Sequence, residues 1–420
     1  MNTAVLQRLA GKVGTPFWIC DAAVLHRRIA NIRKLTSGKG LQARYAMKAW
    51  PATRILKEML ANGLWIDAVS GNEVVRAHRA GFPGSSILYT SDVFRDGAIA
   101  VLRENGVMPN LGSPGMLGEL QAAGYTGPIS LRINPGFGHG HVNTCDTGGP
   151  SSKHGIWFSD IGDVAAQAEK LGMTVVMLHA HIGSGPKFQE LLDNFKRLAS
   201  EFAGLLPKFS RVTAVSLGGG IPHNYRDPNN EPSLELFREL LEESHARICK
   251  AAGRDVRLEI EPGRYVVAPS VTLVTRVSDV KRTQTNEKGK GETFVMVDAG
   301  FTDLIRPWMY GSYHRISLAG RDEREGTANV VVAGPLCESG DVFTRDDDGL
   351  LVPRTLPVPH AGDLLLLHDA GAYGYAMSSN YNSLGRAPQL MLEEDGSVTM
   401  FSRREMVDDL LHIEANEKIL

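Results

Sequence analysis

The segment Ala43-Arg44-Tyr45-Ala46-Met47-Lys48 is a short, mainly apolar run closed by a lysine, and seven similar runs follow it along the chain. Such runs are typical of buried strands, and they lie at 43–47, 64–68, 86–89, 107–110, 129–133, 174–179, 214–217 and 256–260. Between them, apolar residues recur at helical spacing over 53–62, 72–80, 116–123, 161–171, 187–205 and 234–252. Eight alternating units predict an α/β fold of the (β/α)8 TIM-barrel type, with a doubly wound open sheet as the competing fold.

The pattern changes after Arg264, where long helical stretches give way to short strand-like runs. These runs lie at 271–277, 293–297, 329–332, 363–367 and 398–402. They predict a C-terminal all-β domain, barrel-like or sandwich-like, to which the extended segment 15–21 adds a strand and in which 404–413 is helical. We therefore expect the barrel to span 24–264 and the β domain to comprise 1–23 and 265–420.

The composition narrows the class of partner. The 420 residues carry 45 Lys+Arg against 47 Asp+Glu, and this balance offers no basic surplus for nucleic acid or anionic membranes. No uncharged apolar run approaches the roughly 18 residues needed to span a bilayer. The four cysteines form no Cys-x-x-Cys pair, which favours a reducing, cytoplasmic location over a disulfide framework. The 45 glycines exceed the usual proportion of about 7%.

Candidate site residues fall at the ends of the predicted barrel strands, where such barrels carry their chemistry. Lys48 follows the first strand and is either a solvated lysine or a Schiff-base lysine. Gly218-Gly219-Gly220 follows the seventh and is either a tight turn or a loop whose N–H groups bind phosphate. Glu259 and Glu261 share one face of the eighth strand, so one or both should face the barrel mouth. An amine, a phosphate loop and a carboxylate together indicate pyridoxal phosphate.

His179 and His181 leave a metal site open as the alternative, because two histidines on one strand face can bind zinc as well as pack on a flat cofactor. A metal-dependent barrel hydrolase would need further ligands. His139, His141 and Cys145 lie on a glycine-rich loop that would hold a metal poorly, so we expect none.

Seven motifs in order resemble the fold-type III pyridoxal-phosphate decarboxylases and, within them, the bacterial diaminopimelate decarboxylases. They are Tyr-Ala-x-Lys at 45–48, His-Ile-Gly-Ser at 181–184, Gly-Gly-Gly at 218–220, Glu-Pro-Gly-Arg at 261–264, Arg-Pro-x-x-Tyr at 306–310, Cys-Glu-Ser-Gly-Asp at 337–341 and Gly-Ala-Tyr at 371–373. The resemblance covers nearly the whole chain. The long loop that contains 134–141 and 152–155 resembles that of the enterobacterial-type branch of the bacterial diaminopimelate decarboxylases.

The resemblance implies a role for each matching residue. Lys48 would carry the cofactor as a Schiff base, His181 would stack on its ring and Glu261 would pair with the pyridine nitrogen. The phosphate would be held by Ser184, Gly218, Gly219, Gly220 and Tyr373. The distal end of the substrate would be held by Arg264, Arg306, Tyr310, Glu338 and Ser339. Cys337 and Glu338 would reach into the site of a second subunit, which implies a homodimer with shared active sites.

The activity implied is decarboxylation of meso-2,6-diaminopimelate to L-lysine, the last step of lysine biosynthesis, with either Cys337 or Lys48 returning the proton. Rival substrates within the same fold are ornithine, arginine, carboxynorspermidine and a carrier-bound amino acid. Paired arginines favour a substrate with a distal carboxylate. An amino-acid racemase fits less well, because racemases usually place an arginine at the pyridine nitrogen. A non-catalytic cofactor-carrying module would lack the Cys-Glu-Ser run.

Overall fold

The computed structural model describes residues 2–95, 97–138, 147–183, 187–227, 230–321 and 326–415. It divides into two compact units, which we name the barrel unit (His26–Asn224 and Asn229–Val266) and the β unit (Met1–Leu25, Tyr225–Pro228 and Val267–Leu420). The divisions lie two residues beyond the expected limits of 24 and 264. The segment Tyr225–Pro228 belongs to the β unit although the residues on either side of it belong to the barrel unit, and the sequence pattern did not predict this assignment.

Eight parallel strands of the barrel unit's described part form a closed barrel. They are β2 (Leu41–Ala46), β3 (Trp65–Ala68), β4 (Ile87–Ser91), β5 (Met108–Leu111), β6 (Pro128–Asn134), β8 (Thr174–Ala180), β9 (Ala214–Ser216) and β10 (Arg257–Ile260). β10 pairs with β2, and β5 pairs with β6, so the ring has no open edge. The predicted TIM barrel is confirmed. A two-residue strand, β7 (Ile156–Trp157), extends β6 and was not predicted.

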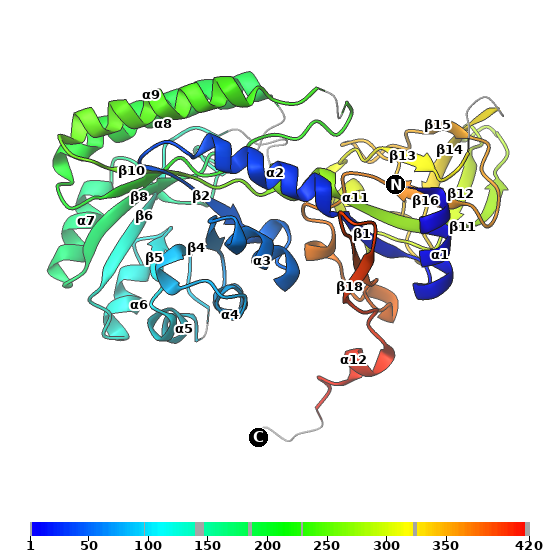
Figure 1. The fold of residues 1–420 in the computed structure, drawn as a ribbon, viewed down its shortest axis with the longest axis horizontal. Helices are drawn as coiled ribbons and strands as arrows, with labels where there is room; N and C mark the ends of the chain where they lie inside the picture. The colour runs from blue at the N-terminus through cyan, green and yellow to red at the C-terminus, as the bar shows by residue number, and fades with distance from the viewer. Residues whose placement is uncertain are drawn as a thin grey trace. The chain divides into compact units, whose positions relative to one another are not determined.

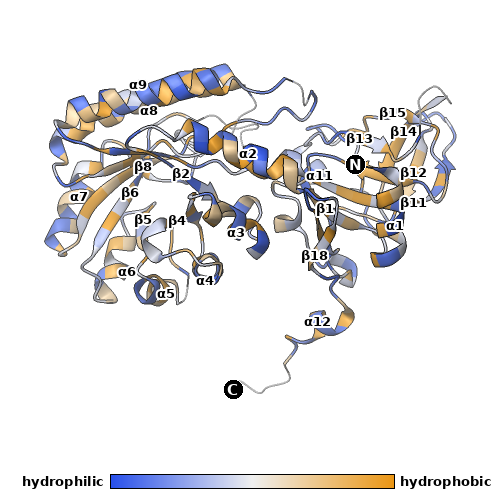
Figure 2. Ribbon diagram, in the orientation of Figure 1, coloured by the Kyte–Doolittle hydropathy of each residue, from blue (hydrophilic) through white to orange (hydrophobic). Residues whose placement is uncertain are grey.

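Helices precede, connect and follow these strands: α2 (Ala22–Leu35), α3 (Thr53–Ala61), α4 (Gly71–Arg79), α5 (Ala98–Asn105), α6 (Met116–Ala122), α7 (Ile161–Lys170), α8 (Phe188–Leu205), α9 (Leu234–Ala252) and α10 (Arg264–Val267). The two longest, α8 and α9, lie side by side (Figure 1) and alternate apolar and polar residues along their length (Figure 2). Ser70 caps the N-terminus of α4: its hydroxyl accepts a hydrogen bond from the Glu73 N–H, while the Glu73 carboxylate accepts one from the Val69 N–H.

The barrel interior changes character along the strands. Leu88, Met177 and Ala214 form an apolar cluster with Met108. Side chains alternate along a strand, so the residues two positions further on face inward too, and these are polar. They are Thr90, Asn110, His179 and Ser216, all buried. The barrel therefore rests on an apolar layer and carries a polar layer toward its C-terminal end, where the active sites of such barrels lie.

The β unit is built on a mixed sheet that contains nine strands in the part of the chain described. They are β1 (Phe17–Asp21), β11 (Val271–Arg282), β12 (Thr293–Val297), β13 (Ile316–Leu318), β14 (Thr327–Ala333), β15 (Arg354–Pro357), β16 (Leu364–Leu367), β17 (Gln389–Leu392) and β18 (Val398–Ser402). As predicted, the segment before the barrel joins this sheet: β1 lies between β11, antiparallel, and β17, parallel. The C-terminal helix is short, α12 (Val407–Leu411).

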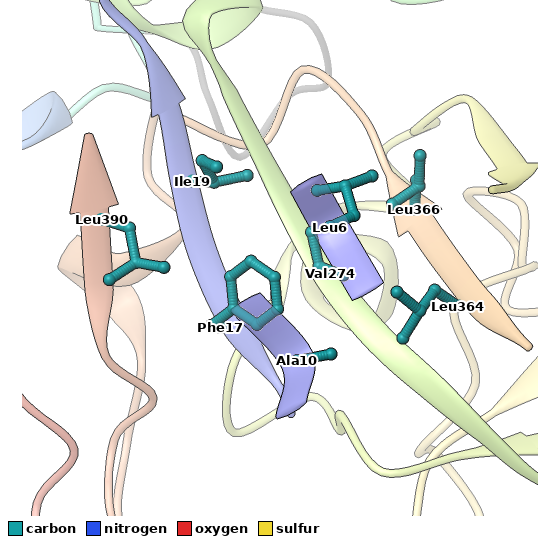
Figure 3. Packing of buried hydrophobic residues seen from close by; sticks show 8 residues of the cluster. All are labelled: Leu6, Ala10, Phe17, Ile19, Val274, Leu364, Leu366 and Leu390. Carbon is teal, nitrogen blue, oxygen red and sulfur yellow. The ribbon is translucent and has the colours of Figure 1, made fainter. Parts of the chain in front are cut away.

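The β unit has its own core around β1. Phe17 and Ile19 on β1 pack with Val274 on β11 and with Leu6 and Ala10 of the helix α1 (Thr3–Val13), as Figure 3 shows. Figure 3 also shows the remaining members of the cluster, which are Leu364, Leu366 and Leu390. Across the described residues, every helix is too short or too polar to cross a bilayer.

Candidate active site

Lys48 lies in a single 3-10 turn, Met47–Ala49, directly after β2. Its neighbours Met47, Ala49 and Trp50 are buried, whereas Lys48 itself is exposed. The Tyr45 hydroxyl donates a hydrogen bond to the Trp50 carbonyl at 3.1 Å and fixes the turn. The backbone of this segment is therefore held in place while the lysine side chain stays accessible at the C-terminal end of the strand.

Glu261 follows β10 and is 5% exposed. Its Oε1 accepts hydrogen bonds from the Ser216 hydroxyl at 2.8 Å and from His179 Nε2 at 2.9 Å. Burial opposes its ionisation, but the electrostatic interaction with the His179 ring and these two hydrogen bonds outweigh burial and lower the pKa of Glu261 to about 2. The carboxylate is thus held charged inside the barrel.

Glu259, two residues earlier, has a different environment. It is fully buried and forms an ion pair with the Arg44 guanidinium, which donates through Nε and through Nη2 at 3.2 Å. Arg257 donates to the same carboxylate at 2.7 Å. Of the two glutamates expected to face the mouth, Glu259 joins β10 to β2 within the barrel, and only Glu261 belongs to the polar layer.

His181 comes directly after β8, and its ring is fixed by a backbone contact. The Gly219 N–H donates to His181 Nδ1 at 2.9 Å, so Nδ1 is unprotonated and the ring proton resides on Nε2. Burial, with the nearby charges of Lys48 and Arg132, lowers the pKa of His181 well below its usual value. His181 is therefore a neutral, oriented ring at physiological pH.

The run of glycines after β9 is needed because its backbone lies very close to the backbone at the ends of β8 and β10. A Cβ on Gly218 would overlap the Ala180 carbonyl, and one on Gly219 would overlap the Glu261 carbonyl. The Gly218 N–H donates to Ser216 Oγ at 3.1 Å, and the Gly219 N–H donates to His181. Gly220 is buried, and its N–H has no partner among the described residues. That N–H can receive an anion.

Thr90, Asn110 and Ser216 complete the polar layer around Glu261, and none of these three was given a role from the sequence. Thr90 Oγ1 donates to Asp67 at 2.6 Å, and Asn110 Nδ2 donates to Thr90 Oγ1 at 3.2 Å. Burial, reinforced by the negative charge of Glu261, raises the pKa of Asp67 to about 7. The signal that could have located Thr90, Asn110 and Ser216 is strand alternation, because each lies two residues beyond an apolar inward position.

Four further residues of the barrel unit have other environments. Arg132 on β6 is 6% exposed, and burial lowers its pKa despite the nearby charge of Asp92. Asn134 accepts hydrogen bonds from Gly136 and Gly149, and so anchors the loop after β6. Arg264 begins α10. Ser184 lies outside the described residues.

In the β unit, Arg306 is buried in the helix α11 (Arg306–Tyr310). Its Nη1 donates to the Ala372 carbonyl at 3.1 Å and to the Tyr225 hydroxyl at 3.2 Å, and its Nη2 donates to Ser312 Oγ at 3.0 Å. Tyr373 has a left-handed backbone, φ 60°, which brings its ring centroid to 5.8 Å from the guanidinium carbon of Arg306. The structure thus brings Arg306 and Tyr373 together, with Tyr310 at the end of the same helix.

Cys337, Glu338 and Ser339 are exposed, and they lie in the turn between β14 and β15. Trp308 packs so closely on the following residue, Gly340, that a Cβ there would overlap its indole nitrogen. Trp308 is itself 48% exposed. The Cys-Glu-Ser segment therefore projects outward from the β unit beside an exposed aromatic side chain.

The functional groups at the barrel mouth are chemically suited to binding pyridoxal phosphate. It offers an accessible amine at Lys48, a carboxylate held ionised at Glu261, a neutral ring at His181 and a buried backbone N–H at Gly220. These are the groups needed for a Schiff base, a pyridinium partner, a ring contact and a phosphate contact. Within the described residues, no group of three His, Cys, Asp or Glu side chains is placed to hold a metal ion.

Comparisons with known proteins agree with this set of groups. The family model described as pyridoxal-dependent decarboxylase, pyridoxal binding domain, matches residues 23–268. The diaminopimelate decarboxylase of Escherichia coli K12 is 38% identical over 418 residues, covering 97% of this chain and 96% of the relative. That of Streptomyces coelicolor is 38% identical over 416 residues, covering 97% of this chain and 90% of the relative.

Solved structures show the same likeness. A crystal structure of diaminopimelate decarboxylase superposes with a TM-score of 0.89 at 37% identity, covering 98% of this chain and 96% of that one. The Helicobacter pylori diaminopimelate decarboxylase, solved in complex with L-lysine, has a TM-score of 0.83 at 27% identity, covering 97% of this chain and 98% of that one.

Proposed function

The chain belongs to the diaminopimelate decarboxylase family of pyridoxal-dependent carboxy-lyases, and from this premise we propose that it converts meso-2,6-diaminopimelate to L-lysine and carbon dioxide. The observation that carries the proposal is the barrel mouth, where one ionised carboxylate, one neutral imidazole and one accessible amine surround a glycine loop. This is the last step of lysine biosynthesis, in the cytoplasm. The cysteines Cys20, Cys249 and Cys337 are free thiols, as a reducing compartment requires.

Four residues of the barrel unit would hold the cofactor. Lys48 supplies the amine that reacts with the cofactor's aldehyde, and Glu261 pairs with its pyridine nitrogen. His181 supplies the ring on which the cofactor stacks, and Gly220 supplies an N–H for the phosphate. Ser184, Gly218, Gly219 and Tyr373 complete the phosphate contacts that the family resemblance implies. When bound, pyridoxal phosphate supplies an electron sink for the pair that remains as the carboxylate leaves.

The protein's own groups prepare the site for this chemistry. Glu261 stays ionised because Ser216 and His179 both donate to it, so it can hold a proton on a heterocyclic nitrogen. His181 is neutral and cannot compete with that nitrogen for the charge of Glu261. The proton that replaces the lost carboxylate comes from Cys337 or from Lys48. Glu261 and His181 therefore set charge and orientation, and proton delivery belongs to the thiol or the amine.

We propose that the distal end of the substrate is bound by Arg264, Arg306, Tyr310, Glu338 and Ser339. A buried arginine oriented by three acceptors suits a planar carboxylate, because its fork geometry is preset. Holding the distal L-centre in this way leaves the D-centre at the reacting position. The same arrangement disfavours ornithine and arginine, which have no distal carboxylate.

We also propose a homodimer in which Cys337 and Glu338 enter the partner subunit's site. Support comes from exposed aromatic side chains beside the exposed Cys-Glu-Ser turn. Phe301 contacts both Trp308 and Tyr381, with ring centroids 5.8 Å and 5.6 Å apart, and Trp308 and Tyr381 are each more than 40% exposed. Aromatic residues with this exposure are enriched in subunit interfaces.

The test of the cofactor assignment is a spectrum followed by peptide mapping. Protein incubated with pyridoxal phosphate should acquire a visible absorption band, and borohydride should bleach it and leave a pyridoxyl label on the peptide containing Lys48. Lys48→Ala should show neither. A wild-type protein with no band, or a label on another lysine, would overturn the assignment.

A further inference from the structure

His179 is fully buried on β8, and its contacts make it a support for Glu261. Its Nε2 lies 2.9 Å from Oε1 and 3.1 Å from Oε2 of that carboxylate, so Nε2 carries the donated proton. Its other ring nitrogen, Nδ1, is buried and has no hydrogen-bond partner among the described residues. A buried nitrogen without a partner is costly, so something must satisfy it.

Two further buried atoms on neighbouring strands lack partners in the same described region. They are Asn110 Oδ1 on β5 and Ser130 Oγ on β6. Asn110 and Ser130 are register partners across β5 and β6, so their side chains share the inward face. His179 is the register partner of Arg132, which lies two residues beyond Ser130 on β6 and has an unpartnered Nε. The four atoms therefore belong to buried side chains on three adjacent strands, β5, β6 and β8.

The orientation of the Asn110 amide is set by its neighbours. Thr90 donates its hydroxyl proton to Asp67 and must therefore accept from Asn110 Nδ2. This contact turns Asn110 Oδ1 away from Thr90 as an acceptor. The layer thus presents acceptors at Asn110 Oδ1 and His179 Nδ1, and donors at the Ser130 hydroxyl and Arg132 Nε.

We propose that His179 is a positioning residue for Glu261, and that one buried water molecule bound by Asn110, Ser130 and His179 fixes its tautomer. The water donates one proton to His179 Nδ1 and the other to Asn110 Oδ1, and it accepts from the Ser130 hydroxyl. This accounts for three of the four unpartnered atoms with the three bonds typical of a buried water. His179 is then locked with its proton on Nε2, directed at Glu261.

The water closes a continuous hydrogen-bonded path around the barrel interior. The path runs from Asp67 through Thr90 and Asn110 to the water, and from the water through His179 to Glu261. Supporting groups of this kind fix the orientation and charge of a functional group, although they do not themselves contact the substrate. The inference rests on the proposed function only in taking Glu261 as the partner of the cofactor nitrogen.

Crystallography of the cofactor-free protein tests the water directly. At high resolution, density for one water should lie within hydrogen-bond distance of Asn110 Oδ1, Ser130 Oγ and His179 Nδ1. Absence of that density, or a direct contact between His179 and another side chain through Nδ1, would overturn the proposed water. This measurement needs neither cofactor nor substrate.

Paired substitutions test the positioning role. His179→Leu removes the donor, whereas His179→Gln keeps an N–H near the Nε2 position. Loss of a hydrogen bond to a charged group typically changes an equilibrium constant by roughly 10- to 100-fold. We therefore expect His179→Leu to raise the dissociation constant of pyridoxal phosphate by that factor. It should also alter the pH dependence of the bound cofactor's absorption band. His179→Gln should restore most of the affinity.

The matched control is His245→Leu, which removes another histidine of the barrel unit. His245 lies on α9 and its Nε2 contacts Cys249 Sγ at 3.3 Å, away from the polar layer. It should leave the absorption band unchanged. If the wild type binds the cofactor and His179→Leu binds it equally well with the same pH profile, the positioning role fails alone. If the wild type binds no cofactor, the proposed function fails, and the crystallographic test of the water still stands.

Discussion

Glu259 and Glu261 are chemically identical side chains on one strand face, and their partners separate their roles. Arg44 and Arg257 neutralise Glu259 inside the barrel, whereas Glu261 accepts hydrogen bonds from Ser216 and His179. Residue type and strand alternation predicted that both could face the mouth. The division between them depends on two arginines, one on the neighbouring strand β2 and one at the start of β10, and a pairing between strands far apart in the chain cannot be seen in a single sequence.

We predict that Glu259→Gln and Glu261→Gln fail in different ways. Glu259→Gln leaves Arg44 buried without its counter-charge, and breaking a buried pair costs about 3–5 kcal/mol of unfolding free energy. Glu261→Gln should leave stability nearly unchanged and lower kcat by about 100-fold or more, because an amide cannot hold a proton on the cofactor nitrogen. Urea unfolding and steady-state kinetics check the pair. Equal stability losses, or full activity in Glu261→Gln, would contradict the assignment.

Asp303 in the β unit predicts how stability depends on pH. Burial raises its pKa from 3.8 to about 7, with the nearby Asp298 and Asp341 adding to the effect. Between about pH 4 and pH 7 the folded protein therefore binds a proton that the unfolded chain has released. The free energy of unfolding falls as pH rises through this window, by up to about 1.4 kcal/mol per pH unit for one group.

Asp303→Asn should remove this contribution. The variant should unfold at higher denaturant concentration than wild type at pH 8, and the difference should shrink toward pH 4, where the folded wild type carries the proton. Asparagine can still accept the Gly300 N–H that Asp303 accepts at 3.1 Å. Urea midpoints measured from pH 4 to pH 8 provide the check. A constant difference across that range would contradict the raised pKa.

At the scale of elements, the loop after β9 shows what a glycine run is for. The run predicted a phosphate loop, but two of its three N–H groups already donate to Ser216 and His181. The missing side chains let β9 pack against the ends of β8 and β10. The main role of the loop is therefore to let the ends of β8, β9 and β10 pack closely at the barrel mouth. It offers a phosphate contact chiefly through the N–H of Gly220.

Gly218→Ala and Gly253→Ala make a matched pair for this element. Both glycines have left-handed backbones, with φ of 75° and 67°, but a Cβ at Gly218 would overlap the Ala180 carbonyl and one at Gly253 would meet nothing within 4 Å. Gly253→Ala should cost about 1 kcal/mol of stability. Gly218→Ala should cost clearly more and abolish tight cofactor binding, measured by urea unfolding and by titration with pyridoxal phosphate. Equal costs for the two would contradict the close packing.

Periodicity predicted the eight barrel strands and six of the helices between them because each carries its own local pattern of apolar residues. It did not single out the helices α1, α2, α5, α10 and α11, or the strands β7, β13, β15 and β17. β7 has two residues and β13 has three, too few for a period to show. β17 is held by β1, whose register partners Trp18 and Gln389 lie far apart in the chain. Strands fixed by distant partners leave little trace in their own residues.

At the scale of the whole molecule, the near-zero net charge fits a small zwitterionic substrate. The proposed dimer makes each active site depend on residues from two chains.

Trp308→Glu would place a charge in the exposed aromatic cluster beside Cys337. We predict that it shifts the protein toward monomer and lowers activity at least tenfold, since a buried charge in an interface is costly. Sedimentation velocity and circular dichroism check assembly and fold together. A dimeric, fully active Trp308→Glu would contradict the proposed interface.

Shared sites have a further consequence that mixing can test. Lys48→Ala and Cys337→Ala homodimers should each be nearly inactive. After the two are mixed and allowed to exchange subunits, a mixed dimer should contain one site with both native residues and so recover up to about a quarter of wild-type activity. No recovery after demonstrated subunit exchange would place Lys48 and Cys337 of each site on the same chain.

The central claim concerns one substrate and one product, and a single stoichiometric assay tests it. Protein loaded with pyridoxal phosphate should convert meso-2,6-diaminopimelate to L-lysine with one carbon dioxide released per lysine formed, and it should leave L-lysine, ornithine and arginine intact. Chiral chromatography of the amino acids, together with manometry or trapped carbonate, measures both products. Intact meso-diaminopimelate alongside conversion of ornithine, arginine or lysine to a diamine would contradict the account.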